Sequence, residues 1–483
     1  MSKKTIMILF AVGIGTFMSA LDSSAVNLAM PTIQTHFQVS MSMAEWVITS
    51  YLLIVSSLLL TFGRLSDLYG HKKIYITGFI IFTLGSLLCG LSVSIVMLIA
   101  FRVLQALGAG MLFAAGPAII TSSVPPESRG KALSVTAIAV ALGLCAGPVI
   151  GGTLTTILNW QSIFFINVPI GIFGSLLAFV KIPEQKKEKP SIPFDKLGSV
   201  MIFAALLLIL LPLNLSGSQR ISTWLFLLLL GLGLLIILAF IAMEQHIKFP
   251  MLNLTLFYNR VFTASNAAAL FTYMAQFMMV FLTPFYLQNL RGYSAFLSGL
   301  LYLPMPIATM LVAPISGIVS DRFDSRYISS GGMLIMAAGL FCLSFLTPST
   351  PIAYIMVCMF FTGIGFGMFQ TPNNSAIMGN IPGAYRGVAS GILATMRNIG
   401  MSIGVAISGA LFSVCQSKGT VLYAKRGLSG TLLSHTAFAY ALRITFLSAM
   451  VVALIAMTAS LVKGKVKTEQ EKQIERSGQR ESS

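Results

Sequence analysis

Charged residues are scarce in this chain. They make up 9% of its 483 residues, whereas a typical soluble domain contains about 25%. Hydrophobic residues reach 56%, and the mean hydropathy is +0.87. A chain with so few charges lacks the polar surface of a water-soluble fold. Its composition therefore excludes the soluble and disordered classes and predicts an integral membrane protein.

Cysteine pairs and enzyme signatures are absent as well. The five cysteines lie in or beside apolar runs and none forms a C-x-x-C pair, so we expect neither a disulfide framework nor a metal site. The chain contains no H-E-x-x-H, G-x-S-x-G or Walker A string. The sequence therefore predicts no enzyme and no cofactor.

Long apolar runs, in contrast, are abundant. A membrane-spanning segment needs roughly 20 apolar residues, and it has to be helical because backbone groups in lipid pair within their own segment. Fourteen runs approach or exceed this length. They cover residues 6–31, 45–64, 73–92, 96–120, 131–155, 161–182, 197–215, 223–243, 261–289, 295–320, 328–347, 351–376, 386–413 and 439–463.

The distribution of Lys and Arg predicts that both termini are cytoplasmic. The first run follows Lys3 and Lys4, but it is too long for a signal peptide, so we expect an uncleaved first helix. Most of the 31 Lys and Arg residues then fall on the cytoplasmic side. The net charge of +17 is thus interpreted as anchoring to the cell membrane rather than as a nucleic-acid site. The outside loops would contain only Arg220, Arg291, Lys418, Lys425 and Arg426.

Two short strings recur at corresponding helix–loop junctions. "GRLSD" (63–67) returns as "GIVSD" (317–321), and "SRGKA" (128–132) returns as "YRGVA" (385–389). Parallel repeats are a known plan of membrane transporters. We predict the following organisation: a six-helix bundle over 1–182, a connector with two inserted helices over 183–250, a second six-helix bundle over 251–463 and a disordered cytoplasmic tail over 464–483.

Two charges inside apolar runs are informative because a lone buried cation costs at least ~2.5 kcal/mol. Asp22 lies in "LDSSAVNLAMP" (21–31) and Arg102 in "RVLQALGAG" (102–110). At 1.5 Å per residue, Asp22 is ~24 Å from the inner end of its helix, and Arg102 is ~9 Å from the outer end of an antiparallel one. Both therefore fall in the outer half of the membrane, and we predict that they lie close together.

The pair has two interpretations. A static ion pair would hold two helices together. A titrating carboxyl group would bind and release protons, because burial opposes its charge whereas a nearby arginine favours it. A proton and a substrate that compete for one charged site are coupled. Both interpretations stay open on the sequence alone.

The loop "GRLSDLYGHKK" (63–73) is a candidate conformational latch. Gly63 is expected to end the preceding helix, and an acidic side chain there can pair with arginine and with a helix N-terminus in one state only. The alternative is an exposed ion pair of little value. The latch residues would be Gly63, Asp67, Gly70 and Lys72, with Asp321 and Arg322 in the second half.

The fifth apolar run contains "GLCAGPVIGG" (143–152). Small residues at every fourth position form a smooth face that lets helices touch closely, and a proline bends the helix. The residues of this string that we single out are Gly143, Gly147, Pro148, Gly151 and Gly152.

Together these strings resemble the major facilitator superfamily. The loop is similar to G-x-L-a-D-r-x-G-r-k, with Leu68 and His71 departing from it, and the fourth-helix string is similar to R-x-x-q-G-x-g, with Ala106 departing. "GLCAGPVIGG" matches the antiporter signature g-x-x-x-G-P-x-x-G-G, and "LDSSAVNLAMP" resembles the l-D-x-T-i-v-n-v-A-l-P motif of the fourteen-helix drug:proton antiporters, with Ser24 replacing threonine. "WQSIFFINVPIG" (160–171) and "FYLQNLRGYSAFLSGLLYLP" (285–304) also look like this branch.

The resemblance implies an all-α major facilitator fold: two six-helix bundles plus a two-helix central insert, fourteen helices in all. It also implies a central cavity lined by helices one and four. Polar and aromatic residues are candidate cavity contacts, although a packing stripe is at least as good an interpretation for several of them. They are Asn27, Tyr273, Gln276, Phe277, Phe281, Asn373 and Arg397.

The expected function is proton-coupled export of amphiphilic small molecules by alternating access. The expected role is multidrug efflux and antibiotic resistance, and we expect the protein to be a monomer. Asp22 and Arg102 would couple protons to substrate, and the proton gradient replaces a cofactor. One alternative is a dedicated exporter of a peptide, siderophore or lipid precursor. Others are a proton-driven importer and a membrane scaffold or sensor. One clear acid against two deep arginines disfavours doubly charged cations and leaves monocations, zwitterions, neutral amphiphiles and anions open.

Overall fold

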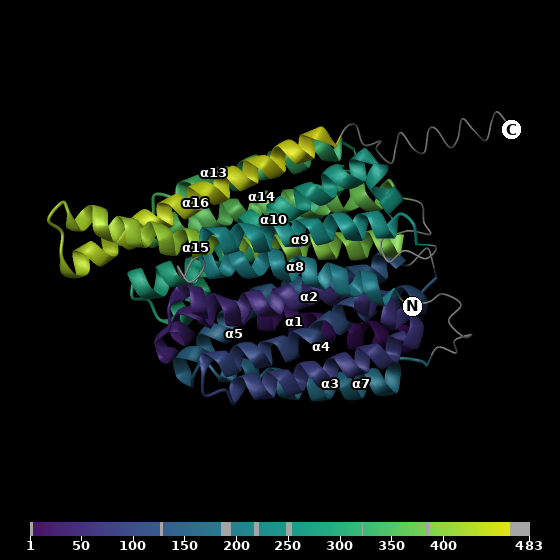
Figure 1. Ribbon diagram of the computed structural model, residues 1–483. Coiled ribbons are helices and arrows are strands. Elements are labelled where there is room, and N and C mark those ends of the chain that lie inside the picture. The colour runs from purple at the N-terminus through teal and green to yellow at the C-terminus, as the bar shows by residue number, and fades with distance from the viewer. Residues whose placement is uncertain are drawn as a thin grey trace. The chain divides into compact units, whose positions relative to one another are not determined.

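The computed structural model describes residues 3–125, 129–184, 195–216, 222–247, 254–320, 322–381 and 386–463 (Figure 1). Every regular element in these ranges is a helix, and thirteen helical segments there are long and apolar enough to cross a membrane. A shorter apolar helix, Leu197–Ile209, is also present. The predicted all-α membrane fold class is confirmed. Most of the connector, the tail over 464–483 and Asp321 lie outside the described residues.

The helices of the first half and of the insert follow the apolar runs closely. They are α1 (Lys3–Phe37), α2 (Met41–Tyr69), α3 (His71–Gly90), α4 (Ile95–Ser123), α5 (Arg129–Ile157), α6 (Ser162–Phe165), α7 (Asn167–Lys181), α8 (Lys196–Ser216) and α9 (Thr223–Glu244). The short α6 and α7 together form one span, and α8 packs against α9 as the predicted two-helix insert.

The second half contains longer and more broken helices. They are the 3-10 turn η2 (Leu254–Tyr258), α10 (Arg260–Phe285), the π-helical η3 (Tyr286–Leu290), α11 (Ala295–Tyr302), α12 (Pro304–Ser320), α13 (Ser325–Leu343), α14 (Ile352–Gly379), α15 (Arg386–Ala424) and α16 (Gly430–Val462). Prolines explain two of the breaks: Pro284 lies just before η3, and Pro304 separates α11 from α12, because proline removes a backbone donor and clashes with the preceding turn.

Three helix ends differ from the prediction. Gly63 does not end α2, which continues to Tyr69 and stops at Gly70. Gly70 has φ +102°, a backbone conformation that glycine adopts easily, so the chain turns there into α3. The predicted outside loop over 414–438 is largely helix, because α15 reaches Ala424 and α16 begins at Gly430. Hydropathy predicts where a span leaves the membrane, but a helix can continue beyond that point.

The described chain divides into two compact units. The first contains Met1–Asn253, Val280–Leu300 and Val405–Lys418, and the second contains Leu254–Met279, Leu301–Gly404 and Gly419–Ser483. The first unit therefore includes pieces of three second-half helices. In it, Asn27 of α1 donates a hydrogen bond to the Val280 carbonyl (2.8 Å), and Gln288 donates one to the Leu28 carbonyl (2.8 Å). The predicted division at residues 182 and 250 stays a prediction.

Candidate functional site

The first unit contains a buried ion pair between α1 and α4. Arg102 Nη1 donates a hydrogen bond to Asp22 Oδ2 at 2.7 Å, and each residue is only 1% exposed. The structure thus brings together the two charges whose depths along their helices matched. A buried pair of this kind is stable only when further hydrogen bonds satisfy both partners.

Two amide side chains complete the hydrogen bonds to the carboxylate. Gln105 Nε2 donates to Asp22 Oδ1 (2.9 Å) and to Ser86 Oγ of α3 (2.6 Å). Asn167, the first residue of α7, donates to the same Asp22 oxygen at 2.8 Å. Asp22 therefore accepts three hydrogen bonds, and both of its carboxylate oxygens have donors. Gln105 and Asn167 were not among the predicted site residues.

Arg102 has partners beyond Asp22. Its Nη1 also donates to Gln105 Oε1 (2.6 Å), and its Nε donates to the Val47 carbonyl of α2 (3.1 Å). The guanidinium lies 4.2 Å from the centroid of the Tyr51 ring, a cation–π contact that favours the charge. This Asp22 network, which comprises Asp22, Arg102, Gln105, Asn167, Ser86 and Tyr51, joins α1, α2, α3, α4 and α7.

The glycine face of α5 positions α1, which bears Asp22. A Cβ on Gly147 would lie 2.9 Å from Ser24 Cβ and 3.0 Å from the Leu21 carbonyl oxygen, so only glycine allows this approach. Gly143 and Gly151 meet Ala20 and Ala25 of α1 in the same way. Ser24, which replaces the family's threonine, donates a hydrogen bond to the Gly143 carbonyl at 3.2 Å. The small-residue face thus acts as a helix-packing surface, as its spacing predicted.

The remaining residues of that string contact α11. A Cβ on Gly152 would lie 3.0 Å from Phe296 Cα, and Gly299 of α11 lies against the Pro148 carbonyl. Phe296 N also donates to Thr156 Oγ1 at 3.0 Å. These contacts lie within the first unit, so α5 packs against α1 on one side and α11 on another.

Glu45 is a second buried acid. It lies in the first turns of α2, is 1% exposed, and its carboxylate contacts Gly409 of α15 within the first unit. No ion pair or hydrogen bond to this carboxylate occurs among the described residues. It stands beside Trp46 at one end of the second apolar run, and the protein buries it.

The second unit contains a polar group around another arginine. Arg397 Nη2 of α15 donates to Asn374 Oδ1 of α14 at 2.6 Å, and its guanidinium lies 5.4 Å from the centroid of the Tyr273 ring of α10. Gln370 of α14 donates to the Tyr273 hydroxyl at 3.2 Å. We call Tyr273, Gln370, Asn374 and Arg397 the Arg397 cluster.

The other predicted cavity residues occupy different environments. Asn27 and Phe281 belong to the first unit; Asn27 binds a backbone carbonyl and Phe281 is fully buried, 5.2 Å from Phe285. In the second unit, Gln276 donates to Met305 Sδ (3.3 Å), and Asn373 donates to the Ser265 carbonyl (3.0 Å). Phe277 is partly exposed. Asn27, Phe281, Gln276 and Asn373 thus make helix-packing contacts in this structure.

Among the described latch residues, Asp67, Lys72 and Arg322 form no ion pair. Asp67 is exposed in the last turn of α2, and the ion pairs among the described residues are Asp22–Arg102 and Asp324–Arg326. The Lys72 ammonium lies 5.3 Å from the centroid of the Phe179 ring, and Arg322 is exposed. A latch that closes in one state only is compatible with this geometry and stays a prediction.

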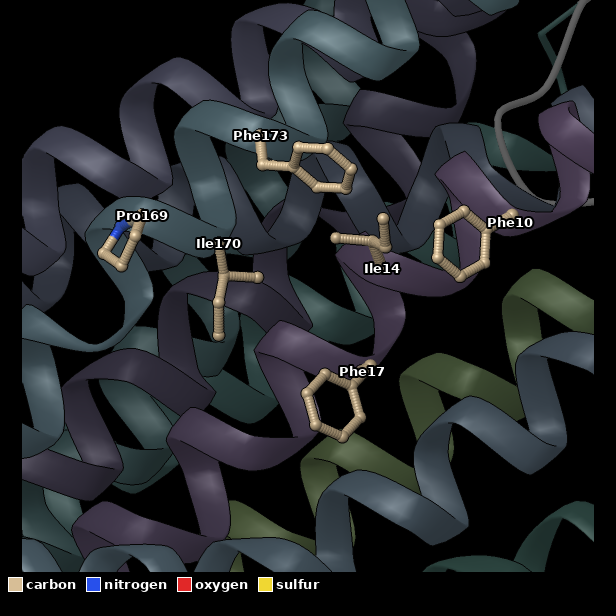
Figure 2. Close-up of a pocket in the computed structure, with 6 residues that line it drawn as sticks. All are labelled: Phe10, Ile14, Phe17, Pro169, Ile170 and Phe173. Atoms are coloured by element: carbon tan, nitrogen blue, oxygen red, sulfur yellow. The ribbon is translucent and has the colours of Figure 1, made fainter.

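An apolar groove lies between α1 and α7. Figure 2 shows Phe10, Ile14 and Phe17 of α1 facing Pro169, Ile170 and Phe173 of α7. Its volume is about 490 Å³, and Phe10 and Phe173 are more than half exposed. No charged or polar side chain lines it, so it offers no group that would bind a proton or a polar ligand.

Apolar helices long enough to cross a membrane, with a buried ion pair among them, define an integral membrane protein. Residues 12–405 match the family model described as Major Facilitator Superfamily, and the chain belongs to that family. The family prediction from the motifs is therefore confirmed.

Three similar proteins illustrate this membership: two are similar in sequence and one in fold. The riboflavin transporter RibZ of Clostridioides difficile (strain 630) is 36% identical, over 85% of this chain and 89% of that protein. The multidrug resistance protein Stp of Mycobacterium tuberculosis (strain CDC 1551 / Oshkosh) is 30% identical, over 90% and 81%. The solved structure of a bacterial homologue of the human lysosomal transporter Spinster shares the fold, with a TM-score of 0.68 at 17% identity over 96% of this chain and 97% of that one.

Proposed function

We propose that this protein is a proton-coupled exporter of amphiphilic small molecules that works by alternating access. The observation that carries the proposal is the buried carboxylate of Asp22, held on α1 by three donors from α4 and α7. The antiporter-type string on α5 and the relative named for multidrug resistance support the direction of transport. The proposal includes a cell-membrane location with both termini in the cytoplasm.

Protonation of Asp22 would change which helices are linked. The ion pair joins α1 to α4, whereas the other partners of Arg102, which are Val47, Gln105 and the Tyr51 ring, lie on α2 and α4. A neutral Asp22 therefore loosens α1 from α4 and leaves Arg102 with its α2 and α4 partners. A proton that favours one arrangement over the other shifts the equilibrium between them, as alternating access requires.

The network also contains an acceptor for the added proton. A protonated carboxyl group gains an O–H donor, and Asn167 Oδ1 is buried beside Asp22 with no hydrogen-bond partner among the described residues. Outside protons would neutralise Asp22 and favour release of the substrate. Loss of the proton to the cytoplasm would restore the ion pair and favour loading.

Asp22→Asn tests this proposal. In proteoliposomes, the variant should lose uphill transport driven by a pH gradient, because asparagine does not bind and release the proton. Downhill transport of the same compound should persist, because asparagine keeps the size of the side chain and one oxygen that can accept the hydrogen bond from Arg102. Gradient-driven transport at the wild-type rate would refute the coupling role of Asp22.

A structural role for Asp22 predicts a different result. If the pair only holds helices together, Asp22→Asn should lower downhill and uphill transport equally. Ser24→Thr is a matched control on the same helix, because it restores the family's residue and keeps the hydroxyl that bonds Gly143.

A dedicated transporter of a single compound is the second candidate function. The observation that favours it is the 36% identity to a protein named as a riboflavin transporter. Transport of riboflavin and of a chemically diverse dye panel by the same proteoliposomes separates the two functions. Movement of riboflavin alone would support the dedicated transporter, and the direction of its flux would decide between export and import.

A further inference from the structure

We infer that the substrates of this protein include aromatic compounds with an acidic oxygen, such as a carboxylate or phenolate, and that Arg397 binds this oxygen. The inference rests on the proposed function and names its substrate class. It concerns the Arg397 cluster of the second unit, which is formed by α10, α14 and α15.

Arg397 has hydrogen-bond donors to spare. Its guanidinium carries five N–H donors, of which one, on Nη2, is used by Asn374. Its Nε is buried and has no partner among the described residues, and no described carboxylate lies within 4 Å of any of its nitrogens. The side chain is partly exposed, so a ligand can reach it. A planar fork with free donors matches the geometry of a carboxylate or another anionic oxygen.

The membrane spans of the second unit contain no counter-charge. The sequences of α12, α13, α14 and α16, and the parts of α10 and α15 in this unit, include no aspartate or glutamate. A cation in a membrane helix is costly unless it is paired. Here the missing negative charge would come from the substrate, and a cationic substrate would meet Arg397 without any carboxylate to offset it.

The surroundings of Arg397 favour an aromatic ligand. The Tyr273 ring lies under the guanidinium, and the Phe366 ring meets the Tyr273 ring edge-on at 5.2 Å. Gln370 and Asn374 are one turn apart on α14, so their amides lie on one face of that helix, and both are partly exposed. Gln370 bonds Tyr273 and Asn374 bonds Arg397, so this face is the one that meets the Arg397 cluster. Aromatic rings, amides and one cation without a carboxylate partner among the described residues together suit a flat ligand with polar oxygens at its edge.

Two dyes with the same xanthene ring system test the inference: fluorescein, which is anionic, and rhodamine 123, which is a cation with an esterified carboxyl group. Their binding to the purified full-length protein in detergent is measured by fluorescence polarisation without any gradient. The wild-type protein should bind fluorescein at least about tenfold more tightly, as expected for charge-assisted hydrogen bonds. Equal affinities, or tighter binding of rhodamine 123, would overturn the inference.

Variants locate the effect. Arg397→Gln should weaken fluorescein binding about tenfold to a hundredfold and leave rhodamine 123 binding unchanged or tighter. Arg397→Lys, which keeps the charge but loses the planar fork, should fall between wild type and Arg397→Gln. The control is Arg443→Gln, since Arg443 is an exposed arginine on α16 of the same unit. It should change both affinities by less than about twofold. Equal loss of fluorescein binding in both Gln variants would mean that general charge, not Arg397, is responsible.

Failure of this inference and failure of the proposed function give different results. Gradient-driven, Asp22-dependent transport of rhodamine 123 without fluorescein binding would overturn the inference and leave the exporter proposal intact. Fluorescein binding that depends on Arg397, without transport of either dye under any pH gradient, would support the ligand class and count against proton-coupled transport.

Discussion

The two arginines that lie deepest in the membrane spans have opposite surroundings. Arg102 is 1% exposed and pairs with a carboxylate, an amide, a backbone carbonyl and an aromatic ring. Arg397 is partly exposed and has one amide and one ring. The charge of Arg102 thus has all its partners within the protein, as the proposed coupling through Asp22 requires. The charge of Arg397 keeps unused donors, which is the basis for the inferred anionic ligand.

Stability measurements should separate the two arginines most strongly. Arg102→Gln leaves the Asp22 carboxylate buried without its counter-ion, which should cost about 3–5 kcal/mol and lower the unfolding temperature by several degrees. Arg397→Gln removes a cation that has no carboxylate partner, so its unfolding temperature should stay the same or rise. The difference in unfolding temperature is measured by heating both variants in the same detergent and detecting the folded fraction by size-exclusion chromatography.

A double variant provides the control for that comparison. Asp22→Asn combined with Arg102→Gln removes both charges and should be more stable than Arg102→Gln alone, because no uncompensated charge remains. If the double variant were as unstable as the single one, packing of the Arg102 side chain rather than its charge would explain the loss. A fall in Arg397→Gln equal to that in Arg102→Gln would remove the distinction between the two sites.

The Asp22–Arg102 contact could be predicted from the sequence because charges in apolar runs are rare and their depths can be counted. Gln105 and Asn167 could not be ranked in the same way, since uncharged amides are common in membrane helices. Gln105 stands in the fourth-helix string, three residues after Arg102, and this spacing was the available signal. Asn167 lies at the α6–α7 break, which hydropathy does not reveal.

Side-chain direction in the second half was harder to predict. The sequence leaves both cavity lining and packing open for Phe281 and Asn373, and in this structure they make packing contacts inside their own units. A helix that is apolar on all sides has no polar face to mark the cavity, so periodicity does not separate packing from binding. Glu45 lies at the end of an apolar run, and hydropathy there does not reveal its buried contact with Gly409.

A packing variant should affect the Asp22 network without affecting the Arg397 cluster. Gly147→Val forces the new side chain against Ser24 and Leu21 of α1, so overpacking should cost about 1–3 kcal/mol and reduce gradient-driven transport. Fluorescein binding at Arg397 in the second unit should change little. Gly231→Val in α9 is the matched control, because no atom lies within 4 Å of a Cβ at that position. Wild-type transport by Gly147→Val would contradict the packing role.

A pH-dependent effect concerns Lys463, a buried cation that directly follows α16. Its Nζ donates a hydrogen bond to the Ser325 carbonyl at 3.5 Å. Burial lowers the pKa of this amine to about 8. The negative charge of Asp324 opposes this lowering, and the positive charge of Arg326 adds to it. Because this pKa lies below the ordinary 10.5, the unfolded chain binds the proton more tightly, so stability should rise as the pH increases from about 8 to 10.5 and stay constant below that range. Lys463→Met should remove this rise in unfolding temperature and stabilise the protein at neutral pH. The control is Lys425→Met, which removes an exposed cation directly after α15 and should retain the rise. A pH profile of Lys463→Met identical to that of the wild type would show that Lys463 is not the titrating group.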